Sequence, residues 1–431
     1  MSSHAGTAEV RSSPTKKRSS RYIRSIAFLD QAFVSGGNFL SGILMARAFG
    51  AYEFGAFTLG WLIVEFMSSL HFAAIIQPML NIGVNEDDSR KREYYTAVAA
   101  QHIVFSGCAG LLVWGSVAFA GNLFPAVNLQ RLAMPLGLAT IAYQWHGFCR
   151  RYLLPASAPV AALCNDVLRF CIQLSILLAL PMLWAQPQSS AGIWIVAAAC
   201  TVSAIHGVVL FGRLEWDSTA FCRILARHWN FSKWLMSSAV MYWMTSQAFY
   251  VMSGFILGAA TTGRLMAALA ITLALNVILQ ALDSFAPAQA AAAMHRGGSA
   301  ELRRYIERLA LLIAVMMGAI VIIVNLEPES LIRLIYGEEY TGVGFMVPWL
   351  CAVGVLHGFN MVLCIWAAAM ERTSFIFRAY TITTCFTVVL VYPLTAYGGV
   401  DGVLLGLVLV EVVKLIMLWI SIKGVQNQRL E

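Results

Sequence analysis

Apolar runs of roughly 20 residues recur along the whole chain and constrain its fold more than any other feature. A helix rises about 1.5 Å per residue, so a run of this length crosses a hydrocarbon layer of about 30 Å. Because an unpaired backbone amide in lipid costs several kcal/mol, each run must be a helix that satisfies its own hydrogen bonds. The runs predict about twelve spans, at residues 27–49, 56–80, 95–119, 131–148, 160–184, 191–212, 233–257, 264–286, 304–325, 343–368, 374–397 and 401–422.

Composition also indicates a chain embedded in lipid. The sequence is 59% hydrophobic and 12% charged, whereas an ordinary soluble domain is about 25% charged. The alternating pattern of a transmembrane barrel is absent. We therefore predict an all-α integral membrane protein. No cofactor or metal site is expected, since the nine cysteines form no C-x-x-C pair and no P-loop or H-E-x-x-H motif is present.

The Lys and Arg residues predict the orientation of the chain. Of the 29, 23 lie before the first span, after the last, or in every second loop, at 90–92, 150–151, 213–233, 296–308 and 372–378. By the positive-inside rule these segments are cytoplasmic, which requires an even number of spans and both termini in the cytoplasm. The net charge of +7 then reflects membrane topology, and nucleic acid is not expected as a partner.

The two halves of the chain resemble one another. The sequence GAYEFG at 50–55 is matched by GAATTG at 258–263, and Pro78 at the end of the second span is matched by Pro287 at the end of the eighth. Two repeats of six spans enter the membrane from the same side, so we expect parallel bundles. The predicted organisation is a disordered basic cytoplasmic tail (1–24), one bundle (25–213), an amphipathic linker helix at the cytoplasmic interface (214–232), a second bundle (233–422) and a short cytoplasmic tail (423–431).

Polar and aromatic residues recur at helical spacing inside three predicted spans, and each set therefore shares one helix face. Either these faces bond neighbouring helices, at about 1 kcal/mol per bond, or they line a wet path. We consider their amide and aromatic side chains candidate substrate contacts. The sets are Gln31, Ser35, Asn38 and Gly42 in the first span, Trp243, Gln247, Tyr250 and Gly254 in the seventh, and Asn276, Gln280 and Asp283 in the eighth.

Charged residues inside the spans are the second group of candidates. The carboxylates Asp30, Glu65 and Asp283 are costly in lipid and are candidate ion-coupling sites. Asp166 with Arg169 and Glu411 with Lys414 lie three residues apart on one helix, which favours structural ion pairs.

A transported anion would need a cationic contact away from the cytoplasmic side. Arg47, at the outer end of the first span, is the first candidate and Arg169 another. The alternative for Arg47 is an interfacial arginine whose head reaches water.

Several segments resemble polysaccharide-transporter proteins, that is, Wzx-type O-antigen and exopolysaccharide flippases of the MOP exporter superfamily, which also contains the MATE drug exporters. They are DQAFVSGGNFLSGILMARAFGAYEFGAFTLG at 30–60, IIQPML, WHGFCRRYLL, LIRLIYGEEYTG and YGGVDGVLLGLVL. The resemblance implies two six-helix bundles in a V, with the first, second, seventh and eighth helices lining a central cavity. It also implies a bacterial inner-membrane protein that moves a polyprenyl-diphosphate-linked saccharide, with a polymerase and glycosyltransferases as pathway partners.

The leading hypothesis is therefore a saccharide-lipid flippase or polysaccharide exporter that works by alternating access. One alternative is a multidrug exporter of the same superfamily. Another is a membrane enzyme, a saccharide polymerase or acyltransferase, using His71, His146 or His357. The short segments outside the membrane disfavour an enzyme, and a non-transporting scaffold would leave the intramembrane carboxylates unexplained.

Overall fold

The computed structural model describes residues 14–87, 89–123, 129–153, 159–184, 186–211 and 216–428. All regular secondary structure in these residues is helical, which confirms the predicted all-α class. Residues 1–13 of the predicted tail lie outside the described part of the chain, and the first helix already begins at Pro14.

The first half of the chain forms one helical bundle. Its elements are α1 (Pro14–His71), the π-helical turn η1 (Phe72–Ile76), α2 (Gln77–Ile82), η2 (Gly83–Asn85), α3 (Lys91–Leu123), α4 (Gln130–Leu153), α5 (Pro159–Leu183) and α6 (Ser189–Val209). Within α1 the chain turns at Gly50, so that the first and second predicted spans are its two legs.

The second half repeats this arrangement. Its elements are α7 (Ser218–Ile256), α8 (Ala259–Ile271), α9 (Leu273–Leu326), α10 (Pro328–Tyr336), η4 (Glu338–Tyr340), α11 (Met346–Ala369) and α12 (Thr373–Gln428). α9 turns at Gly297 and Gly298, and α12 turns at Gly399. The eighth span is α8 and the start of α9, which meet at a bend of 51°.

Twelve helical legs correspond to the twelve predicted spans. Seven helices in the described residues are long and apolar enough to cross a membrane, or eight if the bent α8 and α9 pair is one span. Two of these, in α1 and α12, contain two legs each. α4 and α7 complete the set although they are less apolar, because α4 carries Gln144 and His146 and the spanning part of α7 carries Ser246 and Gln247.

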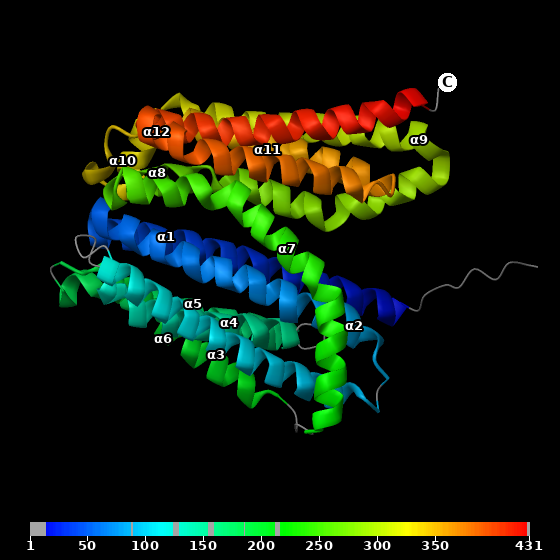
Figure 1. Ribbon diagram of the computed structural model, residues 1–431, viewed down its shortest axis with the longest axis horizontal. Helices are drawn as coiled ribbons and strands as arrows, with labels where there is room; N and C mark the ends of the chain where they lie inside the picture. Colours follow the sequence, from blue (N-terminus) through cyan, green and yellow to red (C-terminus); the bar gives the residue numbers. More distant parts are fainter. Residues whose placement is uncertain are drawn as a thin grey trace, which may run out of the picture.

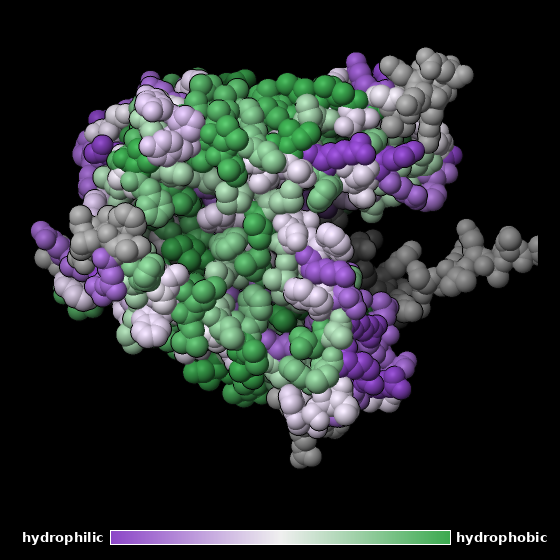
Figure 2. All heavy atoms as spheres, in the orientation of Figure 1, coloured by the Kyte–Doolittle hydropathy of each residue, from purple (hydrophilic) through white to green (hydrophobic). Residues whose placement is uncertain are grey.

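The two bundles lie side by side as the arms of a V (Figure 1). The start of α1, the end of α12, the turn within α9 and the α2–α3 connection lie at one end, which we call the basic end. The turn within α1, α10 and the start of α8 lie at the other, which we call the hairpin end. Figure 2 shows an apolar middle between hydrophilic ends, with a hollow between the bundles at the basic end.

The predicted linker helix is not a separate element. Asp217 caps α7 by accepting a hydrogen bond of 2.8 Å from the Thr219 amide, and the helix then continues without a break through the seventh span to Ile256. α7 therefore begins against the first bundle and ends within the second (Figure 1). Because α7 contacts both bundles, a change in the angle between them must move or bend this helix.

Candidate functional site

Polar faces of α1 and α9 look toward one another between the bundles. Gln31, Asn38, Asn276, Gln280 and Asp283 are all exposed. The Gln31 amide donates a hydrogen bond of 3.1 Å to the side-chain oxygen of Gln280, so the two predicted stripes face each other near the basic end. Exposed amides at this depth require water or a polar ligand rather than lipid.

The three predicted ion-coupling carboxylates have different surroundings. Glu65 and Asp283 are exposed, whereas Asp30 is buried and forms an ion pair with Arg150 inside the first bundle. Glu65 and Asp283 are therefore available to a mobile ion in this conformation, and Asp30 is engaged by a resident cation.

The aromatic face of α7 is largely packed. Tyr250 is buried in the core, and Trp243 packs on Phe66 with ring centroids 4.8 Å apart. Gln247 is half-buried. These contacts join the seventh span to the second, so in this conformation Trp243 and Tyr250 hold helices together and do not present free ring faces.

The matched hairpins close the hairpin end. Gly50 and Gly258 both have a positive φ, of 75° and 92°, which a residue without a Cβ adopts readily. A Cβ on Gly55 would overlap the carbonyl oxygen of Ala259, and a Cβ on Gly263 would overlap that of Ala51. The two repeats thus contribute the same positions to a nearly symmetrical backbone contact.

A short segment of the second bundle, Leu334–Tyr340, fastens this contact, and we call it the latch. Arg47 donates hydrogen bonds to the carbonyl oxygens of Ile335 (2.7 Å) and Leu334 (2.5 Å). The Ala51 amide donates to Glu339 at 2.7 Å, and the Tyr340 hydroxyl donates to the Ala46 carbonyl at 3.1 Å. The structure therefore places Arg47 in an inter-bundle contact rather than in an open cavity.

A pocket of about 200 Å³ lies inside the first bundle. It is open at Asn38 of the α1 stripe and at Phe72 of η1, which are both exposed. Its lining residues come from α1, η1, α4 and α5: Val34, Asn38, Ser68, His71, Phe72, Ile76, Tyr143, Gln144, His146, Gly147, Arg150, Arg151, Asp166 and Arg169.

Arg150 organises the charges around this pocket. It forms ion pairs with both Asp30 and Asp166, the latter at 2.6 Å, and His146 Nε2 lies 3.1 Å from the other oxygen of Asp166. The predicted pairing of Asp166 with Arg169 is therefore not what the structure shows, because α4 supplies nearer donors. The second predicted pair is present, with Lys414 Nζ 2.9 Å from Glu411.

Ser203, His146 and Asp166 form a chain of contacts that resembles a hydrolytic triad. Ser203 Oγ and His146 Nδ1 are 2.7 Å apart. However, Ser203 is fully buried, and its hydroxyl donates to the Asn165 carbonyl at 3.0 Å. His71 is likewise buried against His102 at 2.8 Å, and His357 lies 3.5 Å from Glu411. Ser203 is thus enclosed in the core, and the Nε2 atom of His71 is engaged by His102.

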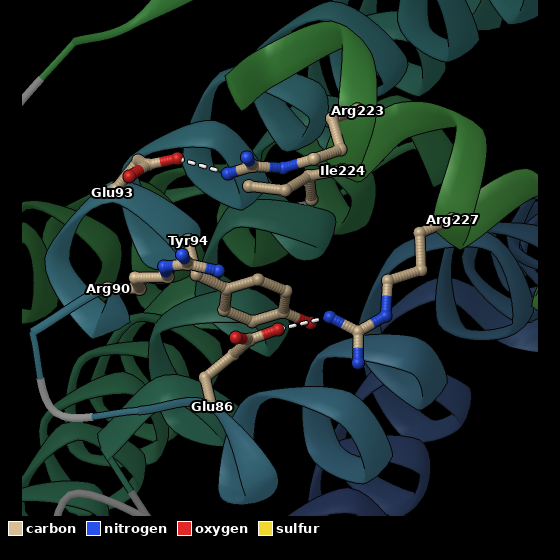
Figure 3. A pocket seen from close by; sticks show the side chains of 7 residues that line it. All are labelled: Glu86, Arg90, Glu93, Tyr94, Arg223, Ile224 and Arg227. Atoms are coloured by element: carbon tan, nitrogen blue, oxygen red, sulfur yellow. Dashed lines mark hydrogen bonds and ion pairs between the residues drawn. The ribbon is translucent and has the colours of Figure 1, made fainter. Parts of the chain in front are cut away.

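The first turns of α7 are docked on the first bundle at the basic end, in a contact that we call the brace. Figure 3 shows Arg223 and Arg227 reaching Glu93 and Glu86 across a cavity of about 160 Å³. Behind them, His228 Nε2 lies 2.9 Å from the Tyr94 hydroxyl, and Ser232 donates to the Ala74 carbonyl of the π-helical turn at 3.1 Å. Burial lowers the pKa of His228 to about 4.

Comparisons with solved structures identify the fold. An inward-facing multidrug resistance MATE family transporter of the MOP superfamily is 14% identical, with a TM-score of 0.67 over 91% of this chain and 95% of that one. The lipid II flippase MurJ, in an inward closed conformation, is 13% identical, with a TM-score of 0.67 over 93% and 87%. The eukaryotic MATE transporter AtDTX14 is 15% identical, with a TM-score of 0.63 over 94% and 95%.

The chain has the fold of MOP-superfamily transporters. The predicted pair of six-helix bundles in a V is thereby confirmed. The sequence matches no protein-family model and no curated protein, so the similarity is one of fold alone. In this fold the exposed amides of α1 and α9 meet where Gln31 bonds Gln280.

The sequence does not predict two parts of the site. Arg150 and Arg151 were assigned to a cytoplasmic loop, although α4 continues to Leu153 and carries both into the pocket. The latch residues Glu339 and Tyr340 belong to the segment LIRLIYGEEYTG, but nothing in that segment predicts its contact with the turn of α1. The signal that points toward this contact is the pair of matched motifs GAYEFG and GAATTG at Gly50 and Gly258.

Proposed function

We propose that the protein moves a lipid-linked oligosaccharide or polysaccharide across a bacterial inner membrane by alternating access, with both termini in the cytoplasm. The observation that supports this most directly is the pair of amide faces on α1 and α9, held between bundles that are fastened at the hairpin end. Amides both donate and accept hydrogen bonds, as sugar hydroxyls require. The flippase activity named for one structural neighbour is consistent with this proposal.

In this mechanism the saccharide enters from the basic end, where the surface is hollow (Figure 2), and leaves when the hairpin contact opens. Glu65 and Asp283 are the exposed carboxylates at which a proton or cation would bind to drive the change. A polymerase and glycosyltransferases of the same pathway are the partners that would use and supply the substrate.

Reconstitution tests the proposal. Vesicles containing the purified protein and a labelled polyprenyl-diphosphate oligosaccharide should transfer label to the opposite leaflet, faster with an imposed ion gradient. Gln31→Leu with Gln280→Leu should reduce the rate at least about tenfold, since two polar contacts are lost. Asn325→Leu is the matched control, because its amide donates to the Val321 carbonyl of its own helix, at 2.8 Å, and takes no part in the contact between Gln31 and Gln280. Absence of transfer across a set of bacterial lipid-linked sugars would refute the proposal.

Export of organic cations is a second candidate function. It is favoured by the exposed carboxylates Glu65 and Asp283, which could neutralise a cationic drug. This alternative would be supported if the wild-type protein exports a cationic dye, Glu65→Gln does not, and the wild-type protein transfers no lipid-linked sugar.

A further inference from the structure

The pocket inside the first bundle contains a cation, Arg169, that has no anionic partner in the described residues. Arg169 is 5% exposed, and its Nε has no hydrogen-bond partner in the described residues. It lies nine residues into the fifth span as predicted from the sequence, or about 14 Å along the helix, and therefore near the middle of the membrane. A guanidinium at this depth is unfavourable unless it is neutralised.

Aromatic rings hold this guanidinium in place without neutralising it. Its central carbon lies 4.6 Å from the centroid of Phe170 and 5.3 Å from that of Tyr143. Such cation–π contacts offset only part of the penalty for removing a charge from water. The rings instead fix the direction in which Arg169 points.

The carboxylates near the pocket are already occupied. Asp30 and Asp166 are both paired with Arg150, and Asp166 also has His146 beside it. Arg151 also lines the pocket, with its guanidinium 4.9 Å from the Phe72 ring. The residues that line the pocket include three guanidinium groups but one carboxylate, Asp166, so the lining itself carries a net positive charge.

Two further polar side chains of the pocket have no partner in the described residues. Both amide atoms of Gln144 and the hydroxyl of Ser68 are buried without a hydrogen bond in the described residues. One water needs about 10–15 Å³ of such space, whereas the pocket offers about 200 Å³. There is room for a group with several oxygen atoms, and donors on several sides to receive it.

We infer that this pocket is a phosphate-binding subsite whose donors are Arg169, Gln144, Ser68 and Asn38. Guanidinium, amide and hydroxyl groups together are the donor set that recognises phosphate oxygens. Asn38 belongs both to the pocket and to the α1 face between the bundles, so a bound phosphate would adjoin the saccharide path. The binding of phosphate is inferred from the residues of the pocket. The further statement that this phosphate belongs to a lipid-linked sugar rests on the proposed function.

Binding can be measured without transport. The purified full-length protein in detergent is titrated with inorganic diphosphate and, separately, with farnesyl diphosphate, by calorimetry. Both should bind saturably, and Arg169→Gln should weaken each by about tenfold or more, because a charge-assisted contact is lost. Tighter binding of farnesyl diphosphate identifies a lipid headgroup as the source, and equal binding identifies free phosphate.

Arg303→Gln is the matched control, since it removes one positive charge from an exposed ion pair with Glu307 at the basic end. If Arg169→Gln fails to fold, Asn38→Asp places a negative charge at the exposed mouth and should weaken binding similarly. Equal binding by wild type and either folded pocket variant, or no saturable binding of either probe, would overturn the subsite. A third result would separate the two proposals: wild type binds both probes saturably, the variants do not, and wild type flips no lipid in vesicles. That result would refute the proposed function and leave the subsite standing.

Discussion

At the scale of single residues, two glycines allow the bundles to touch. Gly55 and Gly263 occupy equivalent places in the repeats, and each lies against a carbonyl of the other bundle. Small residues let helix backbones approach closely in membranes, where apolar side chains alone give little preference for association. The hairpin contact therefore depends on the absence of two Cβ atoms.

Gly55→Ala should loosen the hairpin contact, because its Cβ would overlap the Ala259 carbonyl. Hydrogen–deuterium exchange of residues 50–55 and 258–263 should rise in this variant. Gly115→Ala is the control, since nothing lies within 4 Å of the added atom. That change should leave exchange unaltered and be neutral or stabilising by about 0.4–1 kcal/mol. Unchanged exchange in Gly55→Ala would contradict the role assigned to the contact.

A second residue-scale prediction concerns His228. Its pKa is lowered from 6.5 to about 4 in the folded protein, so the neutral form is the one that the brace accommodates. The contribution of neutral His228 to the stability of the brace is therefore complete above about pH 6.5. This contribution decreases as the pH falls from about 6.5 toward 4, and it changes little below pH 4. Intrinsic amide exchange is base-catalysed and slows as the pH falls, so the readout is the protection factor, the measured rate corrected for the intrinsic rate. The protection factors of residues 218–233 should decrease between pH 7 and pH 5. His228→Gln should abolish this dependence, whereas the exposed His295→Gln should preserve it.

At the scale of elements, the latch and α7 connect the bundles at opposite ends. The latch joins the second bundle to the turn of α1, and the brace holds the start of α7 on the first bundle. Because α7 is one continuous helix, it can pivot as a rigid rod. It cannot bend sharply at the brace without breaking backbone hydrogen bonds of the helix. The latch is the contact that must break when the hairpin end opens.

Glu339→Ala should weaken the latch, because the Ala51 amide at the start of the second leg of α1 loses its acceptor. We expect faster thiol labelling of a cysteine placed at Ala46, which the latch residue Tyr340 contacts. Glu338→Ala is a closely matched control: its side chain is 80% exposed, and its ion pair with Arg333 is long, at 3.8 Å. Equal labelling in the two variants would argue against the latch.

At the scale of the whole molecule, the V shape provides an apolar outer surface with polar faces turned inward. Large apolar side chains such as Leu311, Phe119 and Val389 are exposed around the bundles, which suits contact with lipid. The amide faces and the pocket lie between and within the bundles. In the proposed function, this separation lets a polar headgroup cross while the attached hydrocarbon stays in the membrane.

Transport should require the hairpin end to separate. In a chain whose native cysteines have been replaced, Arg47→Cys and Leu334→Cys can be joined by a cleavable bifunctional maleimide, since these residues meet in the latch. Lipid transfer in vesicles should stop on cross-linking and return on cleavage. Continued transfer by the cross-linked protein would show that the substrate takes another route.

The sequence alone determined the helical class, the number of spans, the repeat and the faces that carry polar residues. These follow from local rules, because lipid demands about 20 apolar residues per span and helix geometry fixes which residues share a face. Only the tertiary structure decided the partner of each charge. Asp166 pairs with Arg150 of a neighbouring helix and not with Arg169 three residues away, and Arg47 binds carbonyl groups nearly 290 positions along the chain. Short-range spacing cannot encode such choices, since they depend on which helices become neighbours and at what depth.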